Sequence, residues 1–68
     1  MMIYVVLTNR FGYGRECFGT YSSLLKARKA IIDICAGDVE DLGNDVYETY
    51  DDRGEYIWFE IIPTTLDK

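Results

Sequence analysis

The sequence predicts an α+β domain in which a four-stranded, mainly antiparallel sheet in ββαββ order carries a single helix on one face. Strand-like segments occur twice before and twice after one segment whose apolar residues have helical spacing. Polar segments that contain glycine separate the members of each strand pair, as expected for hairpins. A chain of 68 residues has room for one hydrophobic core, so we expect residues 1–68 to form a single domain.

The first hairpin is predicted from residues 3–9 and 16–21. The first of these segments alternates between two apolar faces and has the β-branched and aromatic content typical of a strand. The residues between the two segments include Gly12 and Gly14, which can take the positive φ that a tight return requires. The second strand is short, and we expect it at an edge of the sheet.

A helix of about 14 residues is predicted from Ser22 to Gly37. Ser22 or Ser23 can accept a hydrogen bond from the first free amides of the helix and so serve as its N-cap. Gly37 suits a left-handed C-terminal cap. Apolar residues recur at spacings of three and four and form a stripe that can cover a sheet, namely Leu24, Ala27, Ile31, Ile34 and Cys35.

The second hairpin is predicted from residues 45–50 and 55–62, which flank a turn that ends in Gly54. Residues 38–44 are predicted to be a polar, acidic connection between the helix and this hairpin. Pro63 is expected to end the last strand because proline has no amide hydrogen to donate. The residues after it are expected to form a short frayed tail.

The two faces of the sheet are assigned by the alternation of side chains along each strand. The face expected to meet the helix carries Ile3, Val5, Leu7, Ile57, Phe59 and Ile61. The opposite face then carries Tyr4, Val6, Thr8, Val46, Glu48, Tyr50, Tyr56, Trp58, Glu60 and Ile62. This second face is more apolar and aromatic than a sheet face in contact with water.

That aromatic face is the strongest functional signal in the chain. Tyrosine and tryptophan bury large areas at low entropic cost and dominate binding hot spots, and an apolar patch of this size on a monomer favours aggregation. We therefore expect an interface formed by Tyr4, Val6, Tyr50, Tyr56 and Trp58. The alternative is a different register, in which some of these rings lie in the core.

Charge is distributed unevenly along the chain, whose net charge is −5. Residues 1–36 carry five basic and two acidic side chains, whereas residues 37–55 carry one basic and eight acidic side chains. Because nucleic acid phosphates repel a negative protein, we expect no direct nucleic-acid binding. The acidic half can dock on a basic protein or imitate a phosphate backbone, and the alternative is a surface that serves solubility alone. The candidate docking residues are Asp38, Glu40, Asp41, Asp45, Asp51, Asp52 and Glu55.

The sequence lacks side chains that most enzyme active sites require. The chain has no histidine, so neither a Ser-His-Asp nor a Cys-His arrangement can form. Asp51 and Asp52 lie just before Gly54 in the predicted hairpin turn and are expected to be turn residues. Cys17 is expected to be a plain strand residue, and Cys35 a small buried apolar residue. We therefore expect no enzyme activity, no catalytic residue and no cofactor.

Two segments partly match known binding motifs, but each lacks a feature that its motif requires. Gly12, Gly14 and Gly19 lack the parallel βαβ unit that a dinucleotide loop opens. Residues 38–45 offer several oxygen ligands, but Leu42 occupies a ligand position of a calcium loop. Two cysteines without histidine cannot build a zinc cluster, so we expect no metal site.

We expect a cytoplasmic protein. The residues from Met1 to Tyr4 run directly into a strand pattern, without a basic leader followed by a long apolar region. The longest apolar stretches, residues 1–7 and 56–59, are far shorter than the roughly 20 residues that a membrane helix needs. We therefore expect no membrane association.

Three groups of residues follow one another along the chain in a recognisable order. They are Tyr4-Val5-Val6 in the opening strand, Phe18-Gly19-Thr20-Tyr21-Ser22-Ser23 leading into a helix with Lys26-Ala27 and Ala30, and Trp58-Phe59-Glu60 in a late strand. Over most of its length the chain resembles the small ββαββ accessory proteins of unknown function encoded by tailed phages and their bacterial hosts. This resemblance implies a non-enzymatic, cytoplasmic accessory role, such as the inhibition or modulation of a host protein.

These observations predict a small acidic protein, not an enzyme, that binds a partner protein through the aromatic sheet face and the acidic surface. The alternative is a self-associating structural module, a homodimer through the same sheet face without a separate target. The two differ in electrostatics. Self-association through an apolar face depends weakly on salt, whereas docking of an acidic surface on a basic partner weakens as ions screen it.

Overall fold

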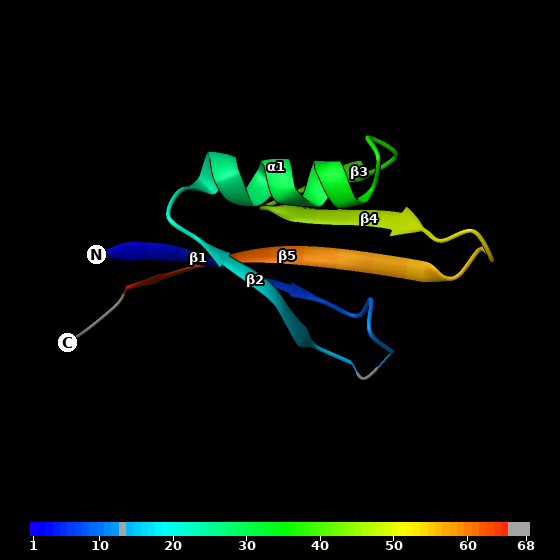
Figure 1. Ribbon diagram of the computed structural model, residues 1–68, viewed down its shortest axis with the longest axis horizontal. Coiled ribbons are helices and arrows are strands. Elements are labelled where there is room, and N and C mark those ends of the chain that lie inside the picture. Colours follow the sequence, from blue (N-terminus) through cyan, green and yellow to red (C-terminus); the bar gives the residue numbers. More distant parts are fainter. Residues whose placement is uncertain (13, 66–68) are drawn as a thin grey trace.

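The structure is a computed structural model that describes residues 1–12 and 14–65. The described part contains β1 (Met2–Thr8), β2 (Glu16–Tyr21), α1 (Leu24–Ile34), β3 (Glu40–Gly43), β4 (Val46–Tyr50) and β5 (Tyr56–Thr65). The strands form one antiparallel sheet in the order β2-β1-β5-β4-β3, and α1 lies on one face of it (Figure 1). The fold is α+β, but the predicted four-stranded ββαββ sheet was wrong, because the sheet has five strands.

The additional strand is β3, where we had predicted an acidic connection. It pairs with β4 through Glu40 and Glu48, and the two-residue turn between the strands places Asn44 and Asp45 at φ values of 54° and 59°. Positive φ at both positions is the conformation that joins two strands most tightly. All residues of β3 are exposed, so backbone pairing stabilises this strand without an apolar pattern that sequence reasoning could detect.

The last strand runs further than predicted. β5 continues through Pro63 to Thr65, so Pro63 does not end it. The ladder between β4 and β5 ends at Glu60, and from there β5 pairs only with β1, where Tyr4 lies opposite Pro63. Proline is tolerated where a strand has one free side, because its missing amide hydrogen is not needed there. Of the predicted frayed tail, residues 66–68 lie outside the described residues.

The helix begins close to the predicted position. Ser23 has an extended conformation and its hydroxyl accepts a 3.1 Å hydrogen bond from the Lys26 amide, which is the expected N-cap. The helix has 11 residues and its C-cap is Cys35, so it ends earlier than predicted. Ala36 is the left-handed residue after the cap, with φ of 53°, and the predicted Gly37 follows it with φ of 80°.

Ala27 and Ile31 are fully buried against the sheet, and Leu24 and Cys35 pack against the same core. The predicted apolar stripe therefore packs on the strands except for Ile34, which is 44% exposed.

The core lies between α1 and the middle of the sheet. Its buried residues are Val6, Thr8, Ala27, Ile31, Tyr47, Phe59 and Ile61, and the Phe18 ring meets the edge of Phe59 at a centroid distance of 5.4 Å. On β5, the residues that face the helix are the predicted Ile57, Phe59 and Ile61.

β1 is turned over relative to the prediction. Tyr4, Val6 and Thr8 face the helix, and Val6 and Thr8 have no exposed surface. The prediction placed all three on the face away from the helix. The Thr8 hydroxyl accepts a 3.0 Å hydrogen bond from the Arg10 amide, so Thr8 is buried with its oxygen satisfied. Ile3, Val5 and Leu7 consequently lie on the face that α1 does not cover.

Candidate interaction surface

The face of the sheet opposite α1 is apolar along its middle, and we call it the open face. The strand register places Val5 beside Ile62, and Leu7 beside Glu60, whose other neighbour is Val46. The apolar members of the open face on β1, β4 and β5 are Ile3, Val5, Leu7, Val46, Trp58 and Ile62, all half-buried. Because side chains of a solvated antiparallel sheet are mostly polar on the outer face, this composition makes the open face the candidate interaction surface.

Three of the five predicted interface residues lie on the open face. Trp58 is half-buried, and the rings of Tyr50 and Tyr56 meet edge to face at a centroid distance of 5.7 Å. Tyr50 and Tyr56 are 61% and 45% exposed. The placement of Tyr4 and Val6 on this face was wrong, because both lie on the helix side of β1. Their places in the patch are taken by Ile3, Val5 and Leu7, which the sequence analysis had put in the core.

Arg15 is a further part of the open face that sequence reasoning missed. Its guanidinium Nη2 lies 2.7 Å from Oε1 of Glu60, and its Cζ lies 5.9 Å from the centre of the Trp58 ring. The side chains of Arg15 and Glu60 remain 59% and 36% exposed, so the pair contributes little to folding stability. Arg15 therefore adds a cation beside the apolar middle of the face.

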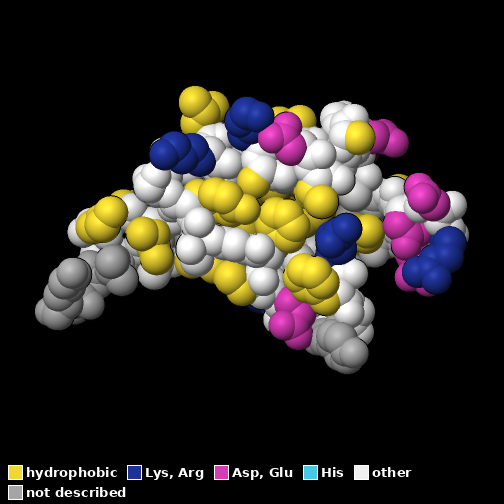
Figure 2. Space-filling view, viewed as in Figure 1, with side chains coloured by type: hydrophobic (Ala, Val, Ile, Leu, Met, Phe, Trp, Pro, Cys, Tyr) yellow, Lys and Arg dark blue, Asp and Glu magenta, His cyan; other side chains and the backbone are white. Residues whose placement is uncertain are grey.

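The predicted acidic docking residues do not form one surface. Asp45 stands in the β3–β4 turn and forms a 2.8 Å ion pair with Arg28, whereas Asp51 and Asp52 stand at the other end of β4. Asp41 accepts a 2.8 Å hydrogen bond from the Gly43 amide in its own strand. Asp38 lines one pocket together with Asp51 and Asp52, whereas Glu40 and Glu55 lie on other segments. In Figure 2, charged side chains of both signs gather at the β4–β5 turn, on the right, and apolar side chains occupy the middle of the view below the helix.

Two carboxylates face each other on the acidic side of the open face. Glu40 of β3 and Glu48 of β4 are directly opposite in the ladder, and Glu48 is also opposite Trp58 of β5. Like charges at opposed positions destabilise a strand pair. Among the described residues neither carboxylate takes part in an ion pair. Burial raises the pKa of the nearby Tyr56 hydroxyl, and its hydrogen bond to Glu48 raises that pKa further.

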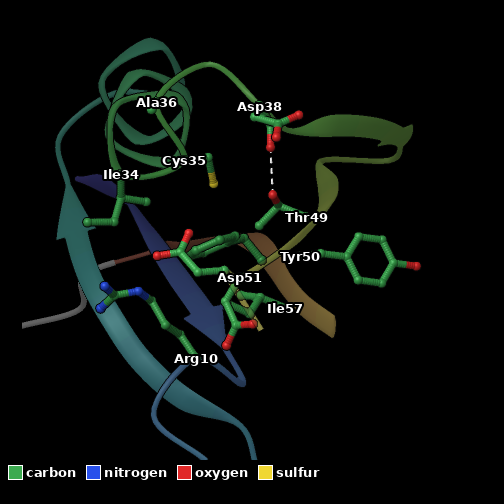
Figure 3. A pocket seen from close by; sticks show the side chains of 11 residues that line it. Arg10, Ile34, Cys35, Ala36, Asp38, Thr49, Tyr50, Asp51 and Ile57 are labelled. Carbon is green, nitrogen blue, oxygen red and sulfur yellow. Dashed lines mark hydrogen bonds between the residues drawn. The ribbon is translucent and has the colours of Figure 1, made fainter. Parts of the chain in front are cut away.

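A pocket of about 480 Å³ opens at the carboxyl end of α1, on the helix side of the sheet (Figure 3). Its walls combine the Arg10 side chain and the Cys35 thiol with carboxylates from two loops, over a floor that includes Ile57 and Phe59. Burial raises the pKa of the Cys35 thiol, although the Arg10 cation acts in the opposite direction. No sequence pattern predicts this pocket, because its residues come from four separate segments.

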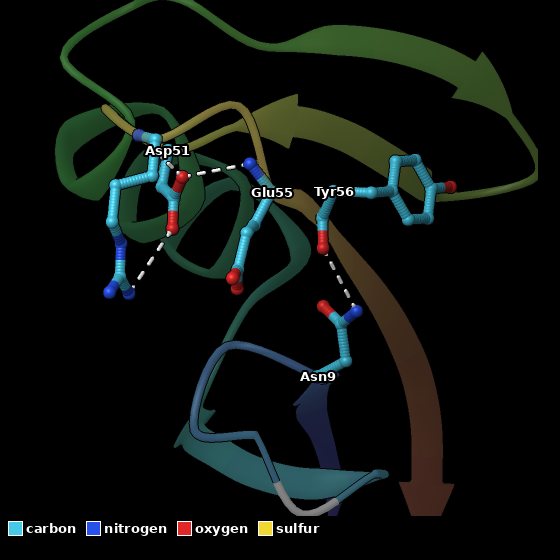
Figure 4. A network of polar contacts seen from close by, with 5 residues as sticks. Asn9, Asp51, Glu55 and Tyr56 are labelled. Carbon is cyan, nitrogen blue, oxygen red and sulfur yellow. Dashed lines mark hydrogen bonds and ion pairs between the residues drawn. The ribbon is translucent and has the colours of Figure 1, made fainter.

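The β1–β2 and β4–β5 turns lie at the same end of the sheet. Side chains from both turns form hydrogen bonds with backbone groups there (Figure 4). Asp51 accepts hydrogen bonds from the amides of Arg53 at 2.8 Å and Glu55 at 2.9 Å, as expected for a turn residue. These bonds, mainly the one from Glu55, lower the pKa of Asp51. Asn9 donates to the Tyr56 carbonyl at 3.1 Å and accepts from the Trp58 amide at 2.9 Å. Asn9 thus continues the β1–β5 pairing with its side chain and fixes the Trp58 end of the open face.

No protein-family model, curated protein or solved structure matches this chain. The resemblance to phage and bacterial accessory proteins therefore remains a prediction. Any functional argument rests on the open face and the groups around it.

Two properties of the described part of the chain bear on membranes and metals. None of its helices has the length and apolar character needed to cross a membrane. Within residues 1–12 and 14–65, no group of three or more Cys, Asp or Glu side chains is arranged so that it could hold a metal ion.

Proposed function

We propose that this chain is a protein-binding module, not an enzyme, and that the open face of the sheet is its binding surface. The observation that carries the proposal is the coverage of only one sheet face by α1, while six apolar side chains on three strands form the other. A binding surface explains these side chains without a catalytic group. The chain offers no histidine to act as a base, and Asp51 is engaged in its own turn.

The charges around the apolar middle restrict the kind of surface that can bind. Glu40 and Glu48 lie on the β3–β4 side of the open face, so the bound protein should present cations there and apolar side chains at its centre. Of the seven residues predicted to form an acidic docking surface, only Glu40 is part of the surface proposed here. The proposal extends to a cytoplasmic accessory role, which is consistent with the free thiols of Cys17 and Cys35.

Photo-crosslinking in cells tests this proposal with a matched pair of positions. Replacing Tyr50, which is 61% exposed on the open face, by p-benzoylphenylalanine should give a defined adduct with a protein. The same replacement at Leu25, which is 76% exposed on the helix, should give none. The captured protein, once purified, should shift Trp58 emission of the unmodified chain.

Two results would contradict the proposal. One is the absence of any adduct at Tyr50. The other is the same set of adducts at Tyr50 and Leu25, which would mean that the open face has no preference over an ordinary exposed position.

A further inference from the structure

The open face has a central strand with opposite charges on its two sides. β5 is the middle strand of the sheet, and it carries Trp58 and Ile62 on the open face. Arg15 reaches over Trp58 from the β2 side. On the other side, the carboxylates of Glu48 and Glu40 lie on β4 and β3, in the same cross-strand row as Trp58.

From this arrangement we infer that the protein bound by the open face is a second copy of the same chain, related by a two-fold axis that runs along β5. The inference rests on the proposed function of that face. Rotation by 180° about β5 exchanges the two sides of the sheet, so β4 of the second copy lies over β1, and its β3 over β2. The second copy's Glu48 and Glu40 then approach Arg15, and the same contact occurs again by symmetry.

The other two-fold axis that keeps the strands of the two sheets aligned places like charges together. An axis perpendicular to the strands within the interface lays β3 and β4 on their own symmetry mates, which brings Glu48 toward the second copy's Glu48. The axis along β5 avoids this and keeps the strands of the two sheets nearly aligned, as in common face-to-face sheet packing. Glu60 stands near that axis, and Arg15 of the same copy already neutralises it at 2.7 Å.

The size of the open face is adequate for such a dimer. Strands about 4.8 Å apart, with 4 to 10 residues each and a mean length of about 21 Å, give the five-stranded sheet a plan area of roughly 500 Å². Protruding side chains such as Trp58 and Tyr56 enlarge the area that becomes buried. Each copy should therefore bury about 600 to 800 Å², which is in the lower part of the range for specific interfaces.

Paired charge reversals test both the dimer and its axis. In Arg15→Glu the new carboxylate opposes those of Glu48 and Glu40 of the second copy at each contact, and in Glu48→Arg two guanidinium groups oppose each other. Each variant alone should dissociate at least about tenfold more readily than the wild type. An equimolar mixture of the two should form a heterodimer, because every contact then joins a carboxylate to a guanidinium group. Sedimentation velocity at micromolar concentration and low salt measures all three samples, and Leu25→Glu, on the helix, should leave the wild-type dimer unchanged.

The outcomes separate this inference from the proposed function. A monomeric wild type at all concentrations overturns the inference, while an adduct between position 50 and a different protein still supports the proposed function. A wild-type dimer whose two charge variants do not rescue each other overturns the axis along β5 and with it the inference. Circular dichroism of each variant verifies folding, and Glu40→Arg replaces Glu48→Arg if the latter is unfolded.

Discussion

The fully buried Ile31 side chain should make a large contribution to folding stability. Ile31 lies at the middle of α1 with no exposed surface, and Ile31→Ala removes three carbon atoms from the core. At about 0.8 kcal/mol per buried methylene the transfer loss is about 2.4 kcal/mol, and the cavity left behind raises the cost to about 2 to 5 kcal/mol. A domain of this size has a free energy of unfolding of about 3 to 10 kcal/mol. The substitution should therefore remove about a fifth or more of the total stability.

Ile32 provides a matched control for this experiment. It is the next residue of the same helix, it has the same side chain, and it is 43% exposed. Ile32→Ala should change the free energy of unfolding by less than about 0.5 kcal/mol, because the better helix propensity of alanine offsets the small loss of burial. Urea unfolding followed by circular dichroism, at one protein concentration, compares the two variants. Equal costs at Ile31 and Ile32 would refute the orientation of α1 on the sheet.

Two further predictions concern the helix cap and a turn. Ser23→Ala should lower the free energy of unfolding by about 1 kcal/mol through loss of the hydrogen bond from the Lys26 amide, and thermal unfolding should show a smaller effect for Ser22→Ala. The lowered pKa of Asp51 in the folded state means that its contribution to stability is complete above the unfolded value of about 3.9 and is lost as pH falls through the folded pKa. Urea midpoints measured from about pH 5 downward should therefore fall less steeply for Asp51→Asn, and identical slopes for both proteins would contradict this assignment.

The helix, its N-cap and both predicted hairpins were accessible from the sequence because each has a local signal. Ser23 can cap, Gly37 can take positive φ, and the apolar stripe of α1 has one period. The side of β1 that faces the helix was not accessible. Both of its faces are apolar, so alternation alone does not distinguish them, and the burial of Thr8 depends on a hydrogen bond that its hydroxyl accepts from the Arg10 amide.

The candidate site was predicted in kind but only partly in its residues, for the same physical reason. Trp58, Tyr50 and Tyr56 were found because β4 and β5 alternate clearly, whereas the contribution of β1 was assigned to the opposite face. The role of Arg15 was not predictable, because its contact with Glu60 joins residues 45 positions apart in the sequence. Contacts of this kind follow from strand order, and strand order is not encoded in any single segment.

The reversal of β1 strengthens the case for a covered open face. With Tyr4 and Val6 outward, the exposed patch would have been largely aromatic, and tyrosine hydroxyls can remain in water at little cost. The structure instead places Ile3, Val5 and Leu7 there, which have no polar atom in their side chains. About 25 cal/mol is gained for each Å² of such surface removed from water, so a second layer over β1 and β5 is favourable even when much of this gain is offset by the entropy lost on association. One helix of 11 residues cannot supply that layer, because it already packs on the other face.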